Sequence, residues 1–102
     1  VADNTLVIFT SDNGAILHKE VHATGHRANA ARLGQKTDAW LGGVNVPFIA
    51  RWPGHIPEGS TTGALISLND FYATACAAAS LPPPSGDGID SINQLPVLKD
   101  PK

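Results

Sequence analysis

The sequence predicts an α/β fold, because two apolar runs typical of strands are followed by an alanine-rich segment typical of a helix. The first run, Leu6 to Thr10, ends abruptly in a polar turn at residues 12–14. The second run is Val44 to Trp52, and the helix is expected over Phe71 to Ala79. Strand, loop, strand and helix in this order are typical of α/β proteins, in which polar residues after a strand face a ligand.

The polar residues after the first run are of the types that bind hard divalent cations. Asp12 and Asn13 carry oxygen ligands suited to Ca²⁺ or Mg²⁺, whereas a zinc or iron site would more often use His or Cys. Asn13-Gly14 is also a strong type I′ turn signal, so a β-hairpin is the alternative interpretation. A hairpin needs a second strand directly after the turn, and Ala15 to Arg32 is polar without sustained alternation. From these residues alone both interpretations stay open.

Between the two strands the chain is expected to form a functional loop. Ala15 to Gln35 is predicted to be irregular with one helical turn, and Lys36 to Trp40 is predicted to form a further short turn. The pair Gly42-Gly43 then frees the backbone. Pro47 indicates an edge strand or the beginning of a strand, and Trp52 to Gly59 has turn chemistry throughout.

The second half of the chain is predicted to contain one more strand and one helix. Thr61 to Leu68 is predicted to be a third short strand. Asn69 or Asp70 supplies an N-cap for the helix, whose alanines have high helix propensity. A run of prolines stops this helix, and the tail from Ser85 onward is expected to be loop-like.

Composition excludes several classes of function. The 102 residues carry a net charge of -2 without a basic stripe, so nucleic acid is not an expected partner. No stretch of about 20 apolar residues could cross a bilayer. Cys76 lies among alanines and is interpreted as a packed residue, and Trp40 and Trp52 are expected to fill a core or bury a loop. The absence of Met also fits a processed mature chain. Because the chain opens just before what we interpret as a strand of a parallel sheet without upstream partners, we expect a fragment of a longer protein.

Four basic side chains are candidates for anion or metal binding. Lys36 lies on a short turn between glycines and can reach a substrate oxyanion, although a solvated surface lysine is the alternative interpretation. His18, His22 and His26 recur every four residues, so a helix could align two of them as zinc ligands. Gly25 interrupts such a helix, and no Glu lies between paired His in a zincin pattern. A loop that lines an anion pocket is the favoured role for His26.

Several ordered segments together resemble the sulfatase family of the alkaline phosphatase-like superfamily. They are Asn4–Gly14, Gly34–Trp40, Gly42–Gly43, Val46–Gly54 and Asn69–Thr74. A lone Asp-Asn-Gly would be weak evidence for this family. The ordered set of segments is specific evidence, and in it Lys36 follows Asn13 by 23 positions. The resemblance implies a mixed sheet flanked by helices, with residues 1–102 forming a later part of a sulfatase catalytic domain that begins at the second metal-ligand strand.

The resemblance also implies a function, that of a sulfuric-ester hydrolase. It implies that Asp12 and Asn13 are two of the ligands of a Ca²⁺, favoured over Mg²⁺, and that Lys36 contacts the sulfate group. His26, in Gly25-His26, resembles a substrate-loop histidine of some members. A sulfate ester is the implied substrate, in the periplasm or outside the cell. The nucleophile, a formylglycine made from Cys or Ser in a Cys/Ser-x-Pro-x-Arg motif, is expected outside this chain.

Departures from the family pattern limit what this chain does alone. The nucleophile motif and the family's paired acidic ligands are absent, so the fragment is expected to be inactive without the upstream part of the catalytic domain. Leu41 and Asn45 replace the usual acid and base of Glu-Gly-Gly and Arg-Val-Pro, and loss of both partners of an ion pair can be nearly neutral. The usual Leu-Arg-Gly is transposed as Arg32-Leu33-Gly34.

Two other functions remain as alternatives. One is a phosphoesterase of the same superfamily. Asn13 argues against this alternative, because phosphoesterase sites often hold zinc with Asp-His at this edge of the sheet. The other is a non-catalytic binding module of the sulfatase type. The identity of the sulfate ester is not predicted, because the residues that would choose it are expected in loops outside this chain.

Overall fold

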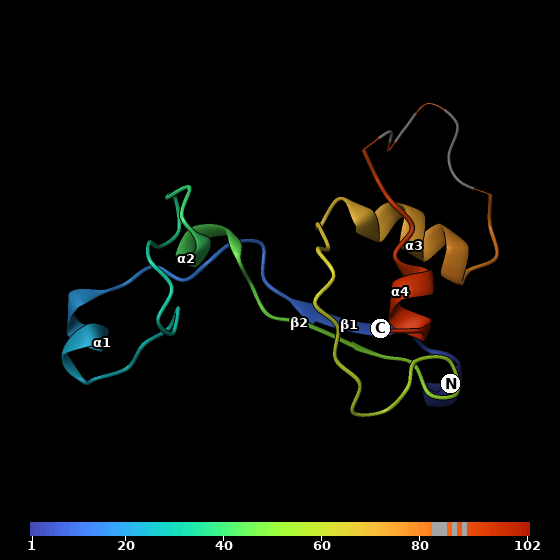
Figure 1. Ribbon diagram of the computed structural model, residues 1–102, viewed down its shortest axis with the longest axis horizontal. Coiled ribbons are helices and arrows are strands. Elements are labelled where there is room, and N and C mark those ends of the chain that lie inside the picture. The colour runs from blue at the N-terminus through green and yellow to red at the C-terminus, as the bar shows by residue number, and fades with distance from the viewer. Residues whose placement is uncertain (83–85, 87, 89) are drawn as a thin grey trace. The chain divides into compact units, whose positions relative to one another are not determined.

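The computed structural model describes residues 1–82, 86, 88 and 90–102 (Figure 1). The described residues form two compact units, one of Val1–Ile8 with Ala50–Lys102 and the other of Phe9–Ile49. The elements in chain order are a 3-10 helix η1 (Ala2–Asn4), β1 (Val7–Thr10), α1 (Lys19–Ala23), α2 (Leu41–Val44), β2 (Phe48–Arg51), α3 (Asp70–Ala78) and α4 (Leu95–Lys99).

The two strands expected from the apolar runs pair with each other. β1 and β2 form a two-stranded antiparallel sheet, in which both strands alternate half-buried and exposed residues. Because β1 pairs with β2 rather than with a segment directly after Asn13-Gly14, the hairpin interpretation is wrong. The expectation of a parallel pair is also wrong for these two strands. Pro47 immediately precedes β2, as expected for the beginning of a strand.

The loop elements between the strands follow the prediction closely. α1 is the one helical turn expected within Ala15 to Gln35, and the segment from Lys36 to Trp40 forms turns and bends. α2 contains Gly42 and Gly43, which are buried rather than flexible. Trp40 lies at the N-cap of α2 and is 60% exposed, so the expectation that it fills a core is wrong.

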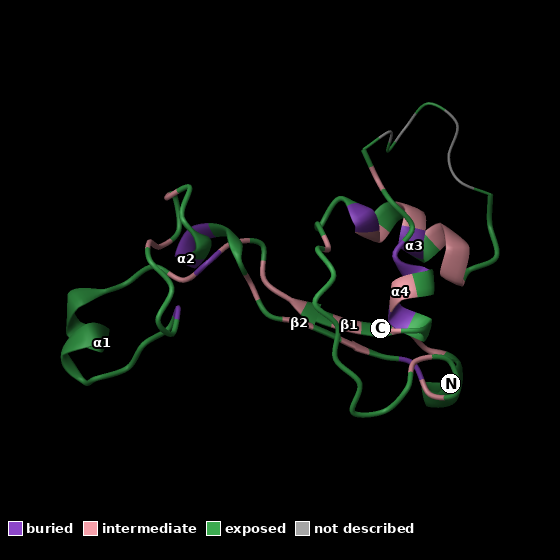
Figure 2. Cartoon of the chain, in the orientation of Figure 1, coloured by how far each residue is buried: buried purple, intermediate pink, exposed green. Residues whose placement is uncertain are grey.

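In the unit of Val1–Ile8 with Ala50–Lys102, α3 confirms the predicted helix and contacts α4. The carboxylate of Asp70 accepts hydrogen bonds from Ser67 N at 3.0 Å, Ile92 N at 3.0 Å and Gln94 Nε2 at 2.8 Å. Thr74 Oγ1 accepts a further hydrogen bond from Gln94 N at 2.9 Å. The buried residues of α3 are therefore polar groups, and their partners come from Ser67 before α3 and from the segment before α4 (Figure 2).

Two predictions about the second half are wrong. Thr61 to Leu68 contains no strand, and Leu65 within it is 95% exposed, because no other strand among the described residues lies beside it. The loop-like tail contains α4, whose Leu95 and Leu98 lie on one face of the helix and are both buried. A three-residue spacing of apolar side chains inside a five-residue helix is too short a pattern to detect from sequence.

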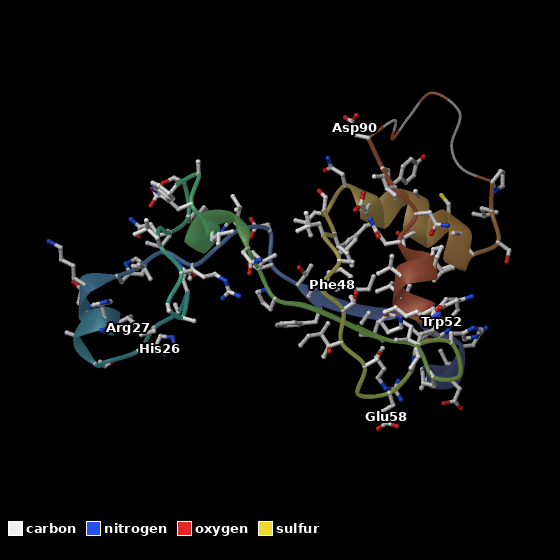
Figure 3. All side chains as sticks on the ribbon, in the orientation of Figure 1. His26, Arg27, Phe48, Trp52, Glu58 and Asp90 are labelled. Atoms are coloured by element: carbon white, nitrogen blue, oxygen red, sulfur yellow. The ribbon has the colours of Figure 1, made fainter. Side chains whose placement is uncertain are left out.

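Trp52 is the large aromatic residue in the core of this unit. Trp52, labelled in Figure 3, is 8% exposed. Its ring stacks on His55 with centroids 4.1 Å apart, and Lys99 Nζ lies 5.6 Å from the ring centroid. The expectation that Trp52 is buried is confirmed. Cys76 is half-buried in α3, in keeping with a packed residue. No helix within the described part of the chain is long and apolar enough to cross a membrane.

Candidate functional site

The tip that follows β1, residues 11–14, is held in place by hydrogen bonds within itself and by one to α2. Ser11 Oγ donates to Asn13 O at 2.9 Å, Asn13 Nδ2 donates to Gly14 O at 3.0 Å, and Gly14 N donates to Gly43 O at 2.8 Å. Asp12 is exposed and Asn13 is half-buried. Among the described residues neither the Asp12 carboxylate nor Asn13 Oδ1 has a hydrogen-bond or ion-pair partner. Both side chains therefore present oxygen atoms free to bind a hard cation, as the donor chemistry of Ca²⁺ requires.

Glycines at four positions allow the segments of this unit to approach each other at backbone distance. A Cβ on Gly14 would collide with Gly42 O and would lie 3.0 Å from Gly43 Cα. A Cβ on Gly42 would in turn collide with Gly34 O, and Gly34 has a φ of 89°, which disfavours other residues. The sequence predicted that Gly42-Gly43 frees the backbone, and the structure corrects this. The glycines are needed because two backbones touch.

Lys36 is brought beside the segment that leaves the tip. Its backbone N–H donates to Ala15 O at 3.1 Å, and Ala15 lies two positions after Asn13. The turn is braced by Gln35, whose Oε1 accepts from Leu17 N at 2.9 Å and whose N–H donates to Asp38 Oδ2 at 3.1 Å. The side chain of Lys36 is exposed, and no carboxylate of the described residues pairs with it. Its ammonium is therefore available to an anion that reaches this face.

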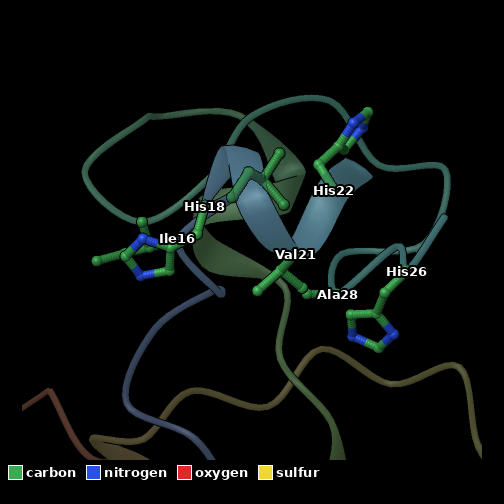
Figure 4. Close-up of a pocket in the computed structure, with 7 residues that line it drawn as sticks. Ile16, His18, Val21, His22, His26 and Ala28 are labelled. Atoms are coloured by element: carbon green, nitrogen blue, oxygen red, sulfur yellow. The ribbon is translucent and has the colours of Figure 1, made fainter. Parts of the chain in front are cut away.

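The three histidines of the long loop do not converge. α1 begins after His18 and ends before Gly25, so His26 lies outside the helix that would align it with the others. Figure 4 shows the three rings pointing in different directions around a small pocket lined also by Ile16, Leu17, Val21 and Ala28. His22 Nε2 accepts a hydrogen bond from Arg27 Nη1 at 2.6 Å. Within the described residues no three of His, Cys, Asp and Glu form a group that could hold a metal, so the zinc interpretation has no support here.

One residue of this unit that the sequence did not single out is Asn29. It is 8% exposed, and it hydrogen-bonds to the backbone of both Ala15 and Gly34. A single Asn in a polar loop is not distinctive in the sequence, because the neighbouring residues do not show which distant backbone groups its side chain will bind. It could have been found only from its partners, which lie 14 and 5 positions away along the chain.

The comparisons with known proteins show the family of the chain. The sequence profile of the family described as Sulfatase matches residues 1–81. The chain belongs to the sulfatase family. The family resemblance predicted from the ordered motifs is confirmed.

Curated sulfatases are similar over almost the whole chain. It is 44% identical over 98 residues to N-acetylgalactosamine-6-sulfatase of Homo sapiens, which covers 96% of the chain and 18% of that protein. It is 37% identical over 100 residues to the uncharacterized sulfatase YdeN of Escherichia coli (strain K12), covering 98% of the chain and 17% of that protein. It is 36% identical over 101 residues to steryl-sulfatase of Rattus norvegicus, covering 96% of the chain and 17% of that protein. The chain thus spans less than a fifth of the length of these relatives.

A solved structure supports the same fold. It is a sulfatase from the metabolism of multiple glycosaminoglycans by Bacteroides thetaiotaomicron, with 33% sequence identity and a TM-score of 0.84, covering 96% of this chain and 22% of that one. The predicted fold class, a fragment of a sulfatase-like α/β sheet with helices, is confirmed.

Proposed function

We propose that the protein to which this chain belongs is a sulfuric-ester hydrolase, and that the chain supplies part of its sulfate site. Asp12 and Asn13 are two of the protein ligands of a Ca²⁺, and Lys36 contacts the sulfate group. The observation that carries this proposal is the backbone link between Ala15 and Lys36, which joins the segment after the oxygen-bearing tip to the turn of the lysine. Membership of the sulfatase family supports the interpretation of the linked residues as parts of a sulfate site.

The tip can provide only part of a calcium site. Ca²⁺ takes roughly six to eight oxygen ligands, of which two side chains supply a minority. The hydrogen bond from Asn13 Nδ2 to Gly14 O, at 3.0 Å, fixes the amide and leaves Oδ1 as the free ligand atom. When bound, Ca²⁺ would offset the negative charge of the sulfate oxygens. The remaining ligands and the nucleophile are expected from other parts of the whole protein.

Lys36 adds a positive charge to the same region. Its backbone is fixed at the Ala15 carbonyl, so its side chain begins from a defined position while its ammonium stays exposed. A charged donor aimed at developing negative charge commonly accounts for about 3 kcal/mol of barrier. Removal of this charge should therefore affect turnover more strongly than folding.

The test uses the product of the complete open reading frame that encodes this chain, assayed with a chromogenic aryl sulfate in Ca²⁺ buffer. Asp12→Asn and Lys36→Ala are each expected to lower kcat/KM by about 10²-fold or more. The matched controls are Asp3→Asn and Lys19→Ala, which make the same changes at exposed side chains outside the site. Wild-type rates in the Asp12 and Lys36 variants would refute the assigned roles.

Two outcomes would favour the alternative functions. Preference for the corresponding aryl phosphate over the aryl sulfate would indicate a phosphoesterase. An upstream sequence that is complete and contains neither the Cys/Ser-x-Pro-x-Arg motif nor a pair of acidic residues would indicate a non-catalytic module. In that case no ester of either kind should be hydrolysed.

A sulfated sugar is the substrate class that we propose to test first. The chain is 44% identical to a relative named for N-acetylgalactosamine-6-sulfate and 36% identical to a steryl-sulfatase over nearly the same residues. A higher kcat/KM for a sulfated N-acetylgalactosamine than for a steryl sulfate would support this order, and the reverse would overturn it. A periplasmic or secreted location belongs to the same proposal, and cell fractionation tests it.

A further inference from the structure

Asn29 uses its whole side-chain amide to hold backbone groups of two separate segments. Its Oδ1 accepts a hydrogen bond from Ala15 N at 2.9 Å. Its Nδ2 donates to Ala15 O at 3.0 Å and to Gly34 O at 3.1 Å. Both amide hydrogens and the oxygen are therefore engaged, and the residue is only 8% exposed.

The two segments are the ones that carry the proposed sulfate site. Ala15 follows Asn13 by two positions, and Gly34 precedes Lys36 by two positions. Ala15 O also accepts the backbone N–H of Lys36 at 3.1 Å, so this carbonyl is shared by Asn29 and the lysine turn. One buried amide thus links the segment after the metal tip to the segment before the sulfate contact.

We propose that Asn29 is a positioning residue, which fixes the Asp12-Asn13 tip relative to Lys36. The inference rests on the proposed function of those residues. It gives Asn29 no part in the chemistry itself, because both N–H groups and Oδ1 already bind backbone groups and the residue is buried.

The bonding pattern explains why an amide is required. The site needs one acceptor facing Ala15 N and two donors facing carbonyl oxygens. An Asp has nearly the same volume but offers only acceptors when ionised, so its oxygen would face the carbonyls of Ala15 and Gly34. An Ala removes the volume and leaves the backbone groups to water, which can enter a polar space of that size.

The test compares Asn29→Asp, Asn29→Ala and the control Asn4→Asp in the product of the complete open reading frame. Asn4 is exposed, and its side chain has no hydrogen bond with the described residues. The measurements are Ca²⁺ affinity by calorimetry, kcat and KM for an aryl sulfate, and hydrogen exchange of the Lys36 backbone amide. Asn29→Asp is expected to bind Ca²⁺ about tenfold more weakly, because a buried group left unpaired costs about a decade in an equilibrium constant. Its kcat should fall more than its KM rises, and the Lys36 amide should exchange faster.

The order of the two Asn29 variants separates positioning from packing. If the donors of Asn29 matter, Asn29→Asp is at least as impaired as Asn29→Ala, although it keeps the volume of the side chain. If only volume mattered, Asn29→Ala would be the worse variant, and that order would overturn the inference. Wild-type Ca²⁺ affinity and Lys36 exchange in Asn29→Asp would also overturn it.

The same experiment separates this inference from the proposed function. A wild-type enzyme that hydrolyses no sulfate ester refutes the function, whatever Asn29 does. Loss of activity in Asp12→Asn together with unchanged behaviour of Asn29→Asp keeps the function and refutes the positioning role.

Discussion

Replacement of Gly14 by alanine tests whether the Asp12-Asn13 tip, proposed above to bind metal, is held by close backbone packing. The Cβ of Gly14→Ala would collide with Gly42 O, lie 2.7 Å from Gly42 C and lie 3.0 Å from Gly43 Cα. These atoms belong to the backbone of α2 and cannot turn aside as a flexible side chain would. The tip and α2 must therefore separate, which also strains the hydrogen bond from Gly14 N to Gly43 O at 2.8 Å.

The expected cost has two parts. Overpacking of a close contact costs about 1 to 3 kcal/mol, and loss of the backbone hydrogen bond adds about 1 kcal/mol. We expect Gly14→Ala to lower the free energy of unfolding of the whole protein by roughly 2 to 4 kcal/mol. Denaturant unfolding at a common m-value measures this change, and calorimetry should show weaker Ca²⁺ binding as the tip moves.

Gly63→Ala is the matched control for this prediction. Nothing lies within 4 Å of the Cβ that it would add, and Gly63 does not have a positive φ. The control should change stability by no more than about 0.5 kcal/mol, as is usual for surface substitutions. Equal unfolding midpoints and equal Ca²⁺ affinities for Gly14→Ala and Gly63→Ala would refute the packing argument.

Two further predictions concern the unit that contains α3 and α4. Asp70→Asn should cost about 1 to 3 kcal/mol at neutral pH, because the new amide nitrogen would face an N–H donor, that of Ile92 or that of Ser67. The hydrogen bond from Ser67 N–H, opposed by burial, lowers the pKa of Asp70. Its contribution to stability is thus complete above about pH 4 and is lost as the pH falls through the folded pKa, and unfolding curves of Asp70→Asn should lack this acid dependence. Lys99→Ala should cost no more than about 1 kcal/mol in thermal unfolding, because its ammonium lies over the Trp52 ring at an exposed site. A larger loss would mean that Lys99 has a role beyond this contact.

The sequence predicted those parts of the fold whose signal is local. β1 and β2 lie within the two apolar runs, and α3 (Asp70–Ala78) matches the alanine-rich segment to within one residue. The Asp12-Asn13 tip follows β1, as the apolar run predicts, and its role as a metal site stays a prediction. Apolar periodicity and residue chemistry were enough for these elements.

The parts that could not be predicted depend on partners far along the chain. Leu95 and Leu98 of α4 are buried, and the residues around them in the sequence do not predict that burial. The glycines of α2 were read as flexible, since the sequence does not reveal that Gly14 lies against them. Asn29 was missed for the same reason. Burial and backbone contact depend on the whole fold. A short stretch of sequence therefore predicts them only where the contacting residues are close in the sequence.

The unit of Phe9–Ile49 contains the proposed site, and its construction has a consequence for folding. Its buried residues are Asn29 and three glycines, so no apolar side chain of this unit is buried. Each hydrogen bond contributes a net stabilisation of about 1 kcal/mol, whereas ordering one residue of backbone costs about 1 to 2 kcal/mol. Hydrogen bonds and glycine contacts alone do not offset that cost, so we expect the order of this unit to depend on parts of the whole protein outside it.

We therefore expect the isolated 102-residue chain to leave this unit largely unprotected. The backbone amides of Gly14 and Lys36, which are hydrogen-bonded in the structure, should exchange rapidly in the isolated chain and slowly in the whole protein. Ca²⁺ should bind the isolated chain only weakly, because two side chains leave most of the coordination shell to water. Slow exchange at both amides, or submicromolar Ca²⁺ affinity of the isolated chain, would show that the unit carries its own stability. The absence of a buried apolar core would then be the wrong measure of what holds the site together.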